Sequence, residues 1–391
     1  YAFDVLMQIY ESQGYSQRDA AKLIVEKNLY GLDIDDRAYQ LAYFAIMMKG
    51  RKFDRRFLTK NAQPNLCSIQ ESNVVEQLDQ VLKMVKLEDK HGGIDYLVSV
   101  FKNAKEFGSI LNLEQRDYDD LFSIIERLKE RDVDDLFFAV ELDSFLAILP
   151  KLIKQAKIMA LQYDVVCTNP PYLNAKYMPP KLKKYVETNY ADYKNDLFTV
   201  FMIKCSYLCN RYGHIGLITP YVWMFLSSYE KLRQDIVSKR TISSLIQLEY
   251  NAFEAACVPV CTFTIRNFNS NIPGEYIKLS DFKGIEVQAP KTLEAINNRE
   301  CGYRFTAIQE NFSKIPGMPI AYWMSESFVR SFENDVHIKN VIDGIASGHK
   351  TANNDKYIRL WYEVNNKSDR WVMLSKGGGY RKWYGNFDSV L

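Results

Sequence analysis

The sequence YDVVCTNPPY at residues 163–172 indicates the fold class of this chain most directly. Its first six residues form a run of strand length with two adjacent valines, and two consecutive prolines end the run. Because proline fixes φ and lacks an N–H donor, we expect a buried strand that leaves its sheet in a stiff turn at residues 169–172. In α/β proteins, ligands bind at the carboxyl ends of such strands.

Strand-like and helix-like patterns alternate on both sides of this stretch. We expect strands at residues 28–35, 64–69, 214–219, 242–248 and 258–265, and helices at residues 37–48, 196–210 and 222–238. This alternation predicts parallel βαβ units and therefore an α/β fold. Residues 73–157 differ, because Leu, Lys, Glu and Asp recur there at helical spacing, and we expect a helical insertion. After Asn267, proline and glycine become frequent, and we expect a loop-rich region.

The composition excludes several classes of protein. Apolar residues make up 47% of the 391 residues, a globular composition that rules out wholesale disorder. No apolar run approaches the ~20 residues of a membrane-spanning helix, and no signal-peptide pattern is present. The 50 Lys and Arg nearly balance the 48 Asp and Glu, so a nucleic-acid site would be a local basic patch. Since the first residue is Tyr1 rather than Met, we expect an intracellular chain cut from a larger protein.

The cysteines raise the question of a metal site. Their odd number argues against a disulfide framework in a chain of this size. Cys205 and Cys209 are four residues apart, as are Cys257 and Cys261, which invites a zinc interpretation. The four histidines have no paired spacing that would complete such a site. We therefore expect buried thiols and no metal.

The turn at residues 169–172 carries the most specific chemistry in the sequence. Asn169 offers an amide oxygen, Pro170 a backbone carbonyl, and Tyr172 an aromatic face, with Pro171 stiffening the turn. Two acceptors beside an aromatic plate suit a planar –NH2 group, whose nitrogen they would free to attack an electrophile. The alternative is a rigid strand-to-helix turn without chemistry.

This Asn-Pro-Pro-Tyr turn resembles the catalytic motif of amino-group methyltransferases that use S-adenosylmethionine, above all the γ class of DNA adenine-N6 enzymes. The resemblance implies a Rossmann-like methyltransferase core with Asn169, Pro170, Pro171 and Tyr172 as catalytic residues. Residues 30–35, YGLDID, resemble the motif in which an acid holds the ribose hydroxyls of the cofactor and the next residue packs on its adenine. Those roles fall to Asp33 and Ile34, although an acid here could instead cap the following helix.

Further roles follow from the same resemblance. Phe253 takes the position of the aromatic that stacks on the target base opposite Tyr172, with a core position as the alternative. The remaining cofactor contacts implied are Glu71, Asn169, Leu197 and Phe198. Four lysines after the turn are candidate phosphate contacts, or else belong to a solvated loop: Lys176, Lys181, Lys183 and Lys184.

The most extensive resemblance is to the PglX-type methyltransferases of BREX phage-defence systems. Type IIG restriction–modification enzymes share several of the same sequence motifs. Residues 28–49, 163–173, 315–323, 347–361 and 376–386 carry the resemblance to the PglX type. In that family a glycine-rich cofactor motif would lie immediately before Tyr1, and target recognition would begin near the last residue. We therefore expect an inactive fragment of an enzyme. Its expected parts are a first core segment (1–72), the helical insertion (73–157), a catalytic core segment (158–270), a connector (271–346) and the start of a target-recognition region (347–391).

The resemblance implies a site-specific adenine-N6 methyltransferase acting on double-stranded DNA in the bacterial cytoplasm, without a metal or a membrane. Other subunits of a phage-defence or restriction–modification system are further candidate partners. A protein-glutamine or ribosomal-RNA methyltransferase is one alternative, because those substrates present a similar –NH2 group. A non-catalytic module that binds DNA or a partner protein is another, and a nuclease could lie outside these residues.

Overall fold

A six-stranded mixed sheet forms the centre of the structure, which is a computed structural model. Its strands are β3 (Tyr163–Thr168), β4 (Cys209–Pro220), β5 (Thr241–Gln247), β6 (Val260–Arg266), β7 (Gly274–Lys278) and β8 (Arg304–Ala307), in the order β3-β4-β6-β5-β7-β8. The pairs β3–β4 and β5–β7 are parallel, whereas β6 runs antiparallel to both of its neighbours. Strands β3, β4, β5 and β7 therefore end at the same edge of the sheet, called the carboxyl edge below. The predicted α/β class is confirmed.

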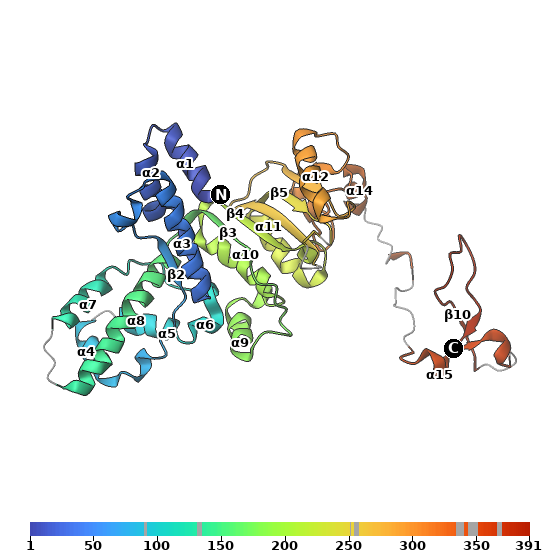
Figure 1. The fold of residues 1–391 in the computed structure, drawn as a ribbon. Coiled ribbons are helices and arrows are strands. Elements are labelled where there is room, and N and C mark those ends of the chain that lie inside the picture. The colour runs from blue at the N-terminus through green and yellow to red at the C-terminus, as the bar shows by residue number, and fades with distance from the viewer. Residues whose placement is uncertain are drawn as a thin grey trace. The chain divides into compact units, whose positions relative to one another are not determined.

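Helices α9 (Pro180–Asn189), α10 (Leu197–Leu208) and α11 (Glu230–Lys239) share the core of this sheet. Figure 1 shows α10 and α11 beside the strands β3, β4 and β5. Alternate residues of β4, such as Ile215 and Leu217, point into this core, as expected for a strand with period-two side chains. Helix α10 is apolar around most of its circumference and is buried, as such helices are.

A smaller sheet holds the first part of the chain. Strands β1 (Tyr30–Asp33) and β2 (Asn65–Ser68) pair in parallel. They are accompanied by α1 (Ala2–Ser12), α2 (Gln17–Leu23), a π-helix (Ile24–Asn28), α3 (Asp36–Phe53) and a 3-10 helix (Phe57–Lys60). The rings of Tyr30 and Tyr163 lie 5.1 Å apart, so the first residues of β1 and β3 are neighbours although these strands belong to separate sheets.

Strand β3 corrects one expectation, because it is not a buried strand. Within the described residues it pairs only with β4 and leaves its other edge open. Val165 is 66% exposed and Cys167 is also exposed. The apolar composition of the strand predicted burial on both sides, but an edge strand has a neighbour on one side only.

The helical insertion is confirmed. Between β2 and β3 the described chain forms α4 (Asp79–Glu88), α5 (Gly93–Val100), α6 (Ala104–Phe107), α7 (Asp120–Lys129) and α8 (Leu136–Ala160), with short 3-10 helices at Val75–Gln77 and Gly108–Ile110. These helices have their own core, built around residues such as Phe101, Leu128 and Phe145. Asp135 caps the first turn of α8 by accepting a hydrogen bond from the Phe137 N–H at 2.8 Å.

Two expectations downstream of β4 are wrong. The single helix expected at 222–238 is two 3-10 turns (Tyr221–Met224 and Ser227–Tyr229) followed by α11. The region after Asn267 is not merely loops, because it supplies β7, β8 and α12 (Ile285–Asn297). Pro290 inside α12 argued against a helix there, since proline removes a helical hydrogen bond. Short helices α13 (Glu310–Ser313), α14 (Glu326–Arg330) and Ser331–Glu333 follow.

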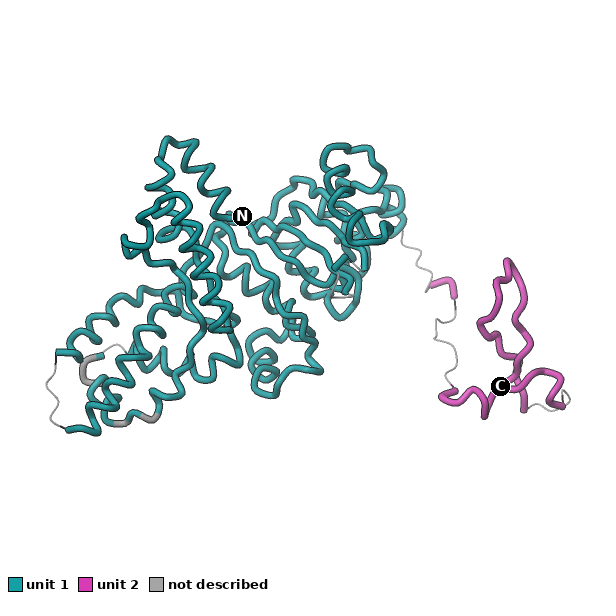
Figure 2. The backbone as a smooth tube through the Cα atoms, in the orientation of Figure 1, with its two compact units in different colours: residues 1–333 teal, residues 334–391 magenta. Residues whose placement is uncertain are grey.

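The chain divides into two compact units, Tyr1–Glu333 and Asn334–Leu391 (Figure 2). In the second unit, α15 (Asn354–Tyr357) precedes a three-stranded sheet of β9 (Arg359–Leu360), β10 (Met373–Leu374) and β11 (Ser389–Val390). The structure describes residues 1–89, 92–130, 135–250, 252–253, 258–333, 340–342, 351–365 and 370–391. Within these residues, every helix is too short or too polar to cross a membrane.

Candidate active site

The Asn-Pro-Pro-Tyr turn leaves the carboxyl end of β3 and is open to solvent. Asn169, Pro171 and Tyr172 are exposed, whereas Pro170 is buried. The Tyr172 hydroxyl lies 3.0 Å from Asn169 Oδ1 and 3.2 Å from the carbonyl oxygen of Ile218 on β4, and both oxygens accept from it. Partial burial raises the pKa of the Tyr172 hydroxyl, so it remains a donor at neutral pH.

The N-terminus of α10 supports this turn. The Leu197 N–H donates to the Leu173 carbonyl at 3.0 Å, and the Ala175 N–H donates to the Asn195 carbonyl at 3.1 Å. Asp196 caps α10, and burial raises the pKa of its carboxyl group. The ring of the buried Phe198 meets Tyr172 edge-on, with centroids 6.4 Å apart. The backbone pairing and this ring contact fix where the face of Tyr172 lies.

This arrangement can orient an amino group. The amide oxygen of Asn169 has two lone pairs, and the Tyr172 hydroxyl engages one of them. The other remains for an incoming N–H donor beside the ring of Tyr172, which is 38% exposed. A polar acceptor next to an accessible aromatic face is the combination expected from the sequence.

Phe253 lies after β5, beyond the same carboxyl edge of the sheet. Its side chain is 42% exposed, so the alternative position in the core is wrong. Tyr250, three residues earlier, is also exposed. Two strands thus place exposed aromatic rings beyond one edge of the sheet, whereas residues 254–257 lie outside the described residues.

The residues expected to hold the ribose and adenine of a cofactor lie beyond β1 and β2. Asp33 is exposed and accepts a hydrogen bond from the Asp35 N–H at 2.9 Å. The alternative role of helix cap belongs to Asp35 instead, which accepts from the Arg37 N–H at 2.8 Å. Ile34 is exposed and lies against Gly108, and Glu71 is half-buried. Asp33 therefore keeps an accessible carboxylate.

A polar cluster that sequence reasoning missed lies beside these residues. Asp36 accepts hydrogen bonds from Lys105 at 2.8 Å and from Gln70 at 3.0 Å. The hydrogen bond from Lys105, followed by one with Ser68, lowers the pKa of the Asp36 carboxyl group to about 2. The cluster connects α3, the end of β2 and α6, residues that are distant in sequence, so spacing alone could not reveal it.

The remaining implied residues have different surroundings. Leu197 and Phe198 are buried in the core, where Phe198 backs Tyr172. Lys181 forms an ion pair with Glu106 at 2.7 Å, although its side chain is 57% exposed. Lys176, Lys183 and Lys184 are also exposed. All four candidate phosphate contacts are therefore accessible from solvent.

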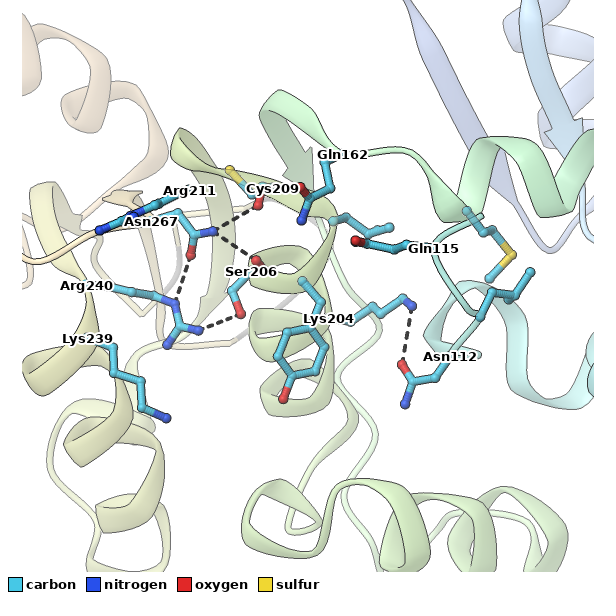
Figure 3. A pocket seen from close by; sticks show the side chains of 14 residues that line it. Asn112, Gln115, Gln162, Lys204, Ser206, Cys209, Arg211, Lys239, Arg240 and Asn267 are labelled. Atoms are coloured by element: carbon cyan, nitrogen blue, oxygen red, sulfur yellow. Dashed lines mark hydrogen bonds between the residues drawn. The ribbon is translucent and has the colours of Figure 1, made fainter. Parts of the chain in front are cut away.

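A cavity of about 610 Å³ lies at the other end of the sheet (Figure 3). Its lining includes Gln162, just before β3, and Cys209, the first residue of β4. Asn267, just after the antiparallel strand β6, also lines it. Several polar groups around it bond to each other: the Asn267 amide donates to Ser206 and Cys209 carbonyls and accepts from Arg240. Because it lies at the opposite edge of the sheet, this cavity is distinct from the Asn-Pro-Pro-Tyr turn.

Lys204 is the buried cation of this cavity. Its ammonium group donates to the Leu111 carbonyl at 2.6 Å, which ties α10 to the helical insertion. Burial lowers the pKa of Lys204 to about 8.

The described cysteines are mostly buried, as expected. Cys67, Cys205, Cys209 and Cys261 are buried, and burial raises the pKa of Cys205 to about 12. Cys167 is exposed because it lies on the edge strand β3. In the part of the chain that the structure describes, no three His, Cys, Asp or Glu side chains gather as a metal site requires. Cys257 lies outside those residues.

Comparison with known proteins identifies the family. A profile of the Eco57I restriction-modification methylase family matches residues 27–253, more than half of the chain. The chain belongs to the Eco57I restriction-modification methylase family. The matched residues include the Asn-Pro-Pro-Tyr turn, Asp33 and Phe253. The resemblance to methyltransferases seen in the sequence is therefore confirmed at the level of the family.

Individual relatives agree with this family. The chain is 35% identical over 410 residues to the adenine-specific methyltransferase PglX of Lacticaseibacillus casei (strain Zhang). It is 32% identical over 424 residues to the adenine-specific methyltransferase BrxX of Escherichia coli O9:H4 (strain HS). Both matches cover 100% of this chain but 34% of the relative, so the chain spans about a third of their length.

Among solved structures, the chain is similar to the ATP-dependent type ISP restriction-modification enzyme LlaBIII bound to DNA. The match covers 78% of this chain and 18% of the LlaBIII chain, with 13% sequence identity and a TM-score of 0.44.

Proposed function

We propose that this chain carries the catalytic and adenine-binding part of a DNA adenine-N6 methyltransferase of a bacterial phage-defence or restriction–modification system. The single observation that supports it most is the Asn-Pro-Pro-Tyr turn, which presents Asn169 and the face of Tyr172 at the carboxyl edge. Membership of a methylase family supports the reaction class, and the names of PglX and BrxX support adenine as the substrate.

The residues present fit part of S-adenosylmethionine. The accessible carboxylate of Asp33 suits the two hydroxyls of a ribose, and the exposed side chain of Ile34 offers an apolar contact for an adenine ring. Glu71, after β2, could accept from the adenine amino group. When bound, this cofactor would supply the methyl group.

The substrate would have to leave the DNA helix, because N6 of adenine is otherwise inside the base stack. Tyr172 and Phe253 would hold the extruded base between their rings. Asn169 Oδ1 and the Pro170 carbonyl would accept hydrogen bonds from the two N6–H groups and so direct the nitrogen lone pair outward; the one proton that N6 loses on methylation would pass to solvent. Such positioning and fixed dipoles need no general base with a matched pKa.

Double-stranded DNA is therefore the proposed partner. The four lysines that follow the catalytic turn would contact phosphates, and one of them, Lys181, also pairs with Glu106. A bacterial cytoplasmic location follows from such a substrate. Other subunits of a defence system are further proposed partners.

The test identifies the methylated product. The product of the whole gene is incubated with radiolabelled S-adenosylmethionine and, in separate reactions, unmethylated bacterial DNA, ribosomal RNA and a bacterial protein extract. N6-methyladenine in the DNA, identified by mass spectrometry, is the expected result. Label in ribosomal RNA or in protein glutamine, with none in DNA, would replace this proposal with one of those methyltransferases. Absence of transfer to all three would favour a module that only binds.

A further inference from the structure

The segment at residues 315–323, called the strap, lies across the carboxyl edge of the large sheet. The Ile320 N–H donates to the Met224 carbonyl at 2.9 Å, just after β4. The Tyr322 hydroxyl donates to the Gln247 side chain at 2.8 Å, at the last residue of β5. The ammonium group of Lys278, the last residue of β7, lies 6.0 Å from the ring centre of Trp323. The strap therefore contacts the ends of three strands.

One buried arginine fastens the strap. The Arg233 guanidinium donates to the Gly317 carbonyl at 2.9 and 2.6 Å, and to the Trp223 and Leu226 carbonyls at 2.8 and 2.6 Å. Gly317 and Met318 have φ values of 78° and 49°, a left-handed turn that a non-glycine residue rarely adopts. This fixed turn positions the residues that follow, including Trp323.

Trp323 is the exposed end of a row of aromatic side chains, of which Phe225 and Tyr221 are half-buried. Its ring contacts Phe225 at 5.5 Å and Tyr322 at 5.0 Å, yet 38% of the residue is exposed. Phe225 in turn contacts Tyr221 at 6.5 Å. Tyr221 is the first residue after β4. Within β4, the carbonyl oxygen of Ile218 accepts a hydrogen bond from the Tyr172 hydroxyl. The row thus starts beside the catalytic turn and ends at Trp323.

An exposed aromatic face at this place has a specific use if the proposed function holds. An adenine that leaves the stack deprives its neighbouring bases of a stacking partner. An aromatic side chain can replace that partner, at about 1–3 kcal/mol per base and without sequence preference. A protein partner would explain exposed aromatic residues equally well in general, but the continuity of this row with the catalytic turn favours nucleic acid.

We propose that Trp323 stacks on a nucleobase that the extrusion of the adenine leaves without its stacking neighbour, an inference that rests on the proposed function. The probe is a fluorescein-labelled single-stranded oligodeoxyadenylate of about 12 nucleotides, titrated with the 391-residue chain by fluorescence anisotropy. We expect Trp323→Ala to weaken binding by about 5- to 150-fold. Trp323→Phe retains a ring and should remain within about threefold of the unaltered chain.

The matched control is Tyr212→Ala. Tyr212 is an exposed aromatic residue with a cation near its ring, the guanidinium of Arg211 at 5.3 Å, but it lies on the first residues of β4 at the opposite edge. Its loss should leave the affinity unchanged. Cross-linking of the unaltered chain to the same oligonucleotide, with one central deoxyadenosine replaced by 5-iododeoxyuridine, needs no variant, and the linked residue should be Trp323.

Two contrary outcomes are distinguishable. If Tyr172→Ala weakens binding while Trp323→Ala does not, and no cross-link forms at Trp323, the inference is overturned while the catalytic surface stands. If the unaltered chain does not bind the oligonucleotide at all, the inference is overturned, whereas DNA as the substrate is decided separately by the methyl-transfer assay of the whole gene product.

Discussion

At the scale of single residues, Tyr172 has two separable parts. Its hydroxyl contacts Asn169 Oδ1, the acceptor proposed for the amino group, whereas its ring is the proposed stacking surface. Tyr172→Phe removes only the hydroxyl and should leave the methylation rate of the whole gene product within about fivefold, because Asn169 gains a free lone pair. Tyr172→Ala also removes the ring and should lower the rate by about 10-fold or more. Equal losses in both variants would show that the hydroxyl is essential.

Lys204 gives a prediction about stability and pH. Its folded pKa of about 8 lies below the ordinary value of 10.5, so between these values the unfolded chain binds more protons. The free energy of unfolding should therefore rise by about 2 kcal/mol from pH 8 to pH 10, through this residue. Urea unfolding at several pH values measures it. Lys204→Met should remove the rise, while the exposed Lys239→Met should not.

The residues of the candidate site show what a sequence can predict. Asn169 directly follows β3, so strand periodicity was enough to place the turn up to Tyr172 beyond a strand end, whereas Asp33, the last residue of β1, was assigned through the family resemblance. The Asp36–Lys105–Gln70 cluster and the ion pair of Lys181 with Glu106 join residues that are 34 to 75 positions apart. No periodicity reports such contacts, because they depend on how the helical insertion packs.

At the scale of elements, strand β3 was predicted with its exact bounds, residues 163–168, but with the wrong burial. Its apolar composition reflects a strand that pairs on both sides, whereas its second edge is open within the described residues. β7 and β8 were missed because proline and glycine surround them, and local turn signals outweigh short strands of four or five residues. The helix α12 was missed for a related reason, its internal Pro290.

The strap and α11 are joined through Arg233, and this junction should be costly to break. Its four hydrogen bonds satisfy three carbonyl groups, one in the strap and two between β4 and α11. Arg233→Met should lower the free energy of unfolding by about 3 kcal/mol, because buried carbonyl groups lose charged donors. Equilibrium urea unfolding provides the measurement, and the exposed Arg330→Met serves as the control. A loss below about 1 kcal/mol would show that the strap is held by its apolar contacts.

At the scale of the whole molecule, two sheets present neighbouring edge strands. β1 and β3 share no ladder, yet Tyr30 and Tyr163 meet at their first residues. The family resemblance implies a glycine-rich cofactor motif before Tyr1, and in Rossmann-like folds such a motif follows a strand. If that strand lies between β1 and β3, hydrogen exchange of amides in residues 163–168 should slow by at least 10-fold in the whole gene product relative to these 391 residues. Strand β4 should exchange at the same rate in both proteins and serves as the reference. If residues 163–168 also exchange at the same rate in both, this placement is contradicted.

In the proposed function, the Asn-Pro-Pro-Tyr turn orients the amino group for methyl transfer. The rate of that transfer without the Asn169 side chain measures this role. Single-turnover transfer of a radiolabelled methyl group from S-adenosylmethionine to DNA is followed for the whole gene product and for Asn169→Ala. Asn210→Ala, at the opposite edge of the same sheet, is the control. We predict that Asn169→Ala slows transfer by at least about 100-fold with an unchanged circular dichroism spectrum, while the control retains its rate. A rate for Asn169→Ala within threefold of the unaltered protein would contradict this role.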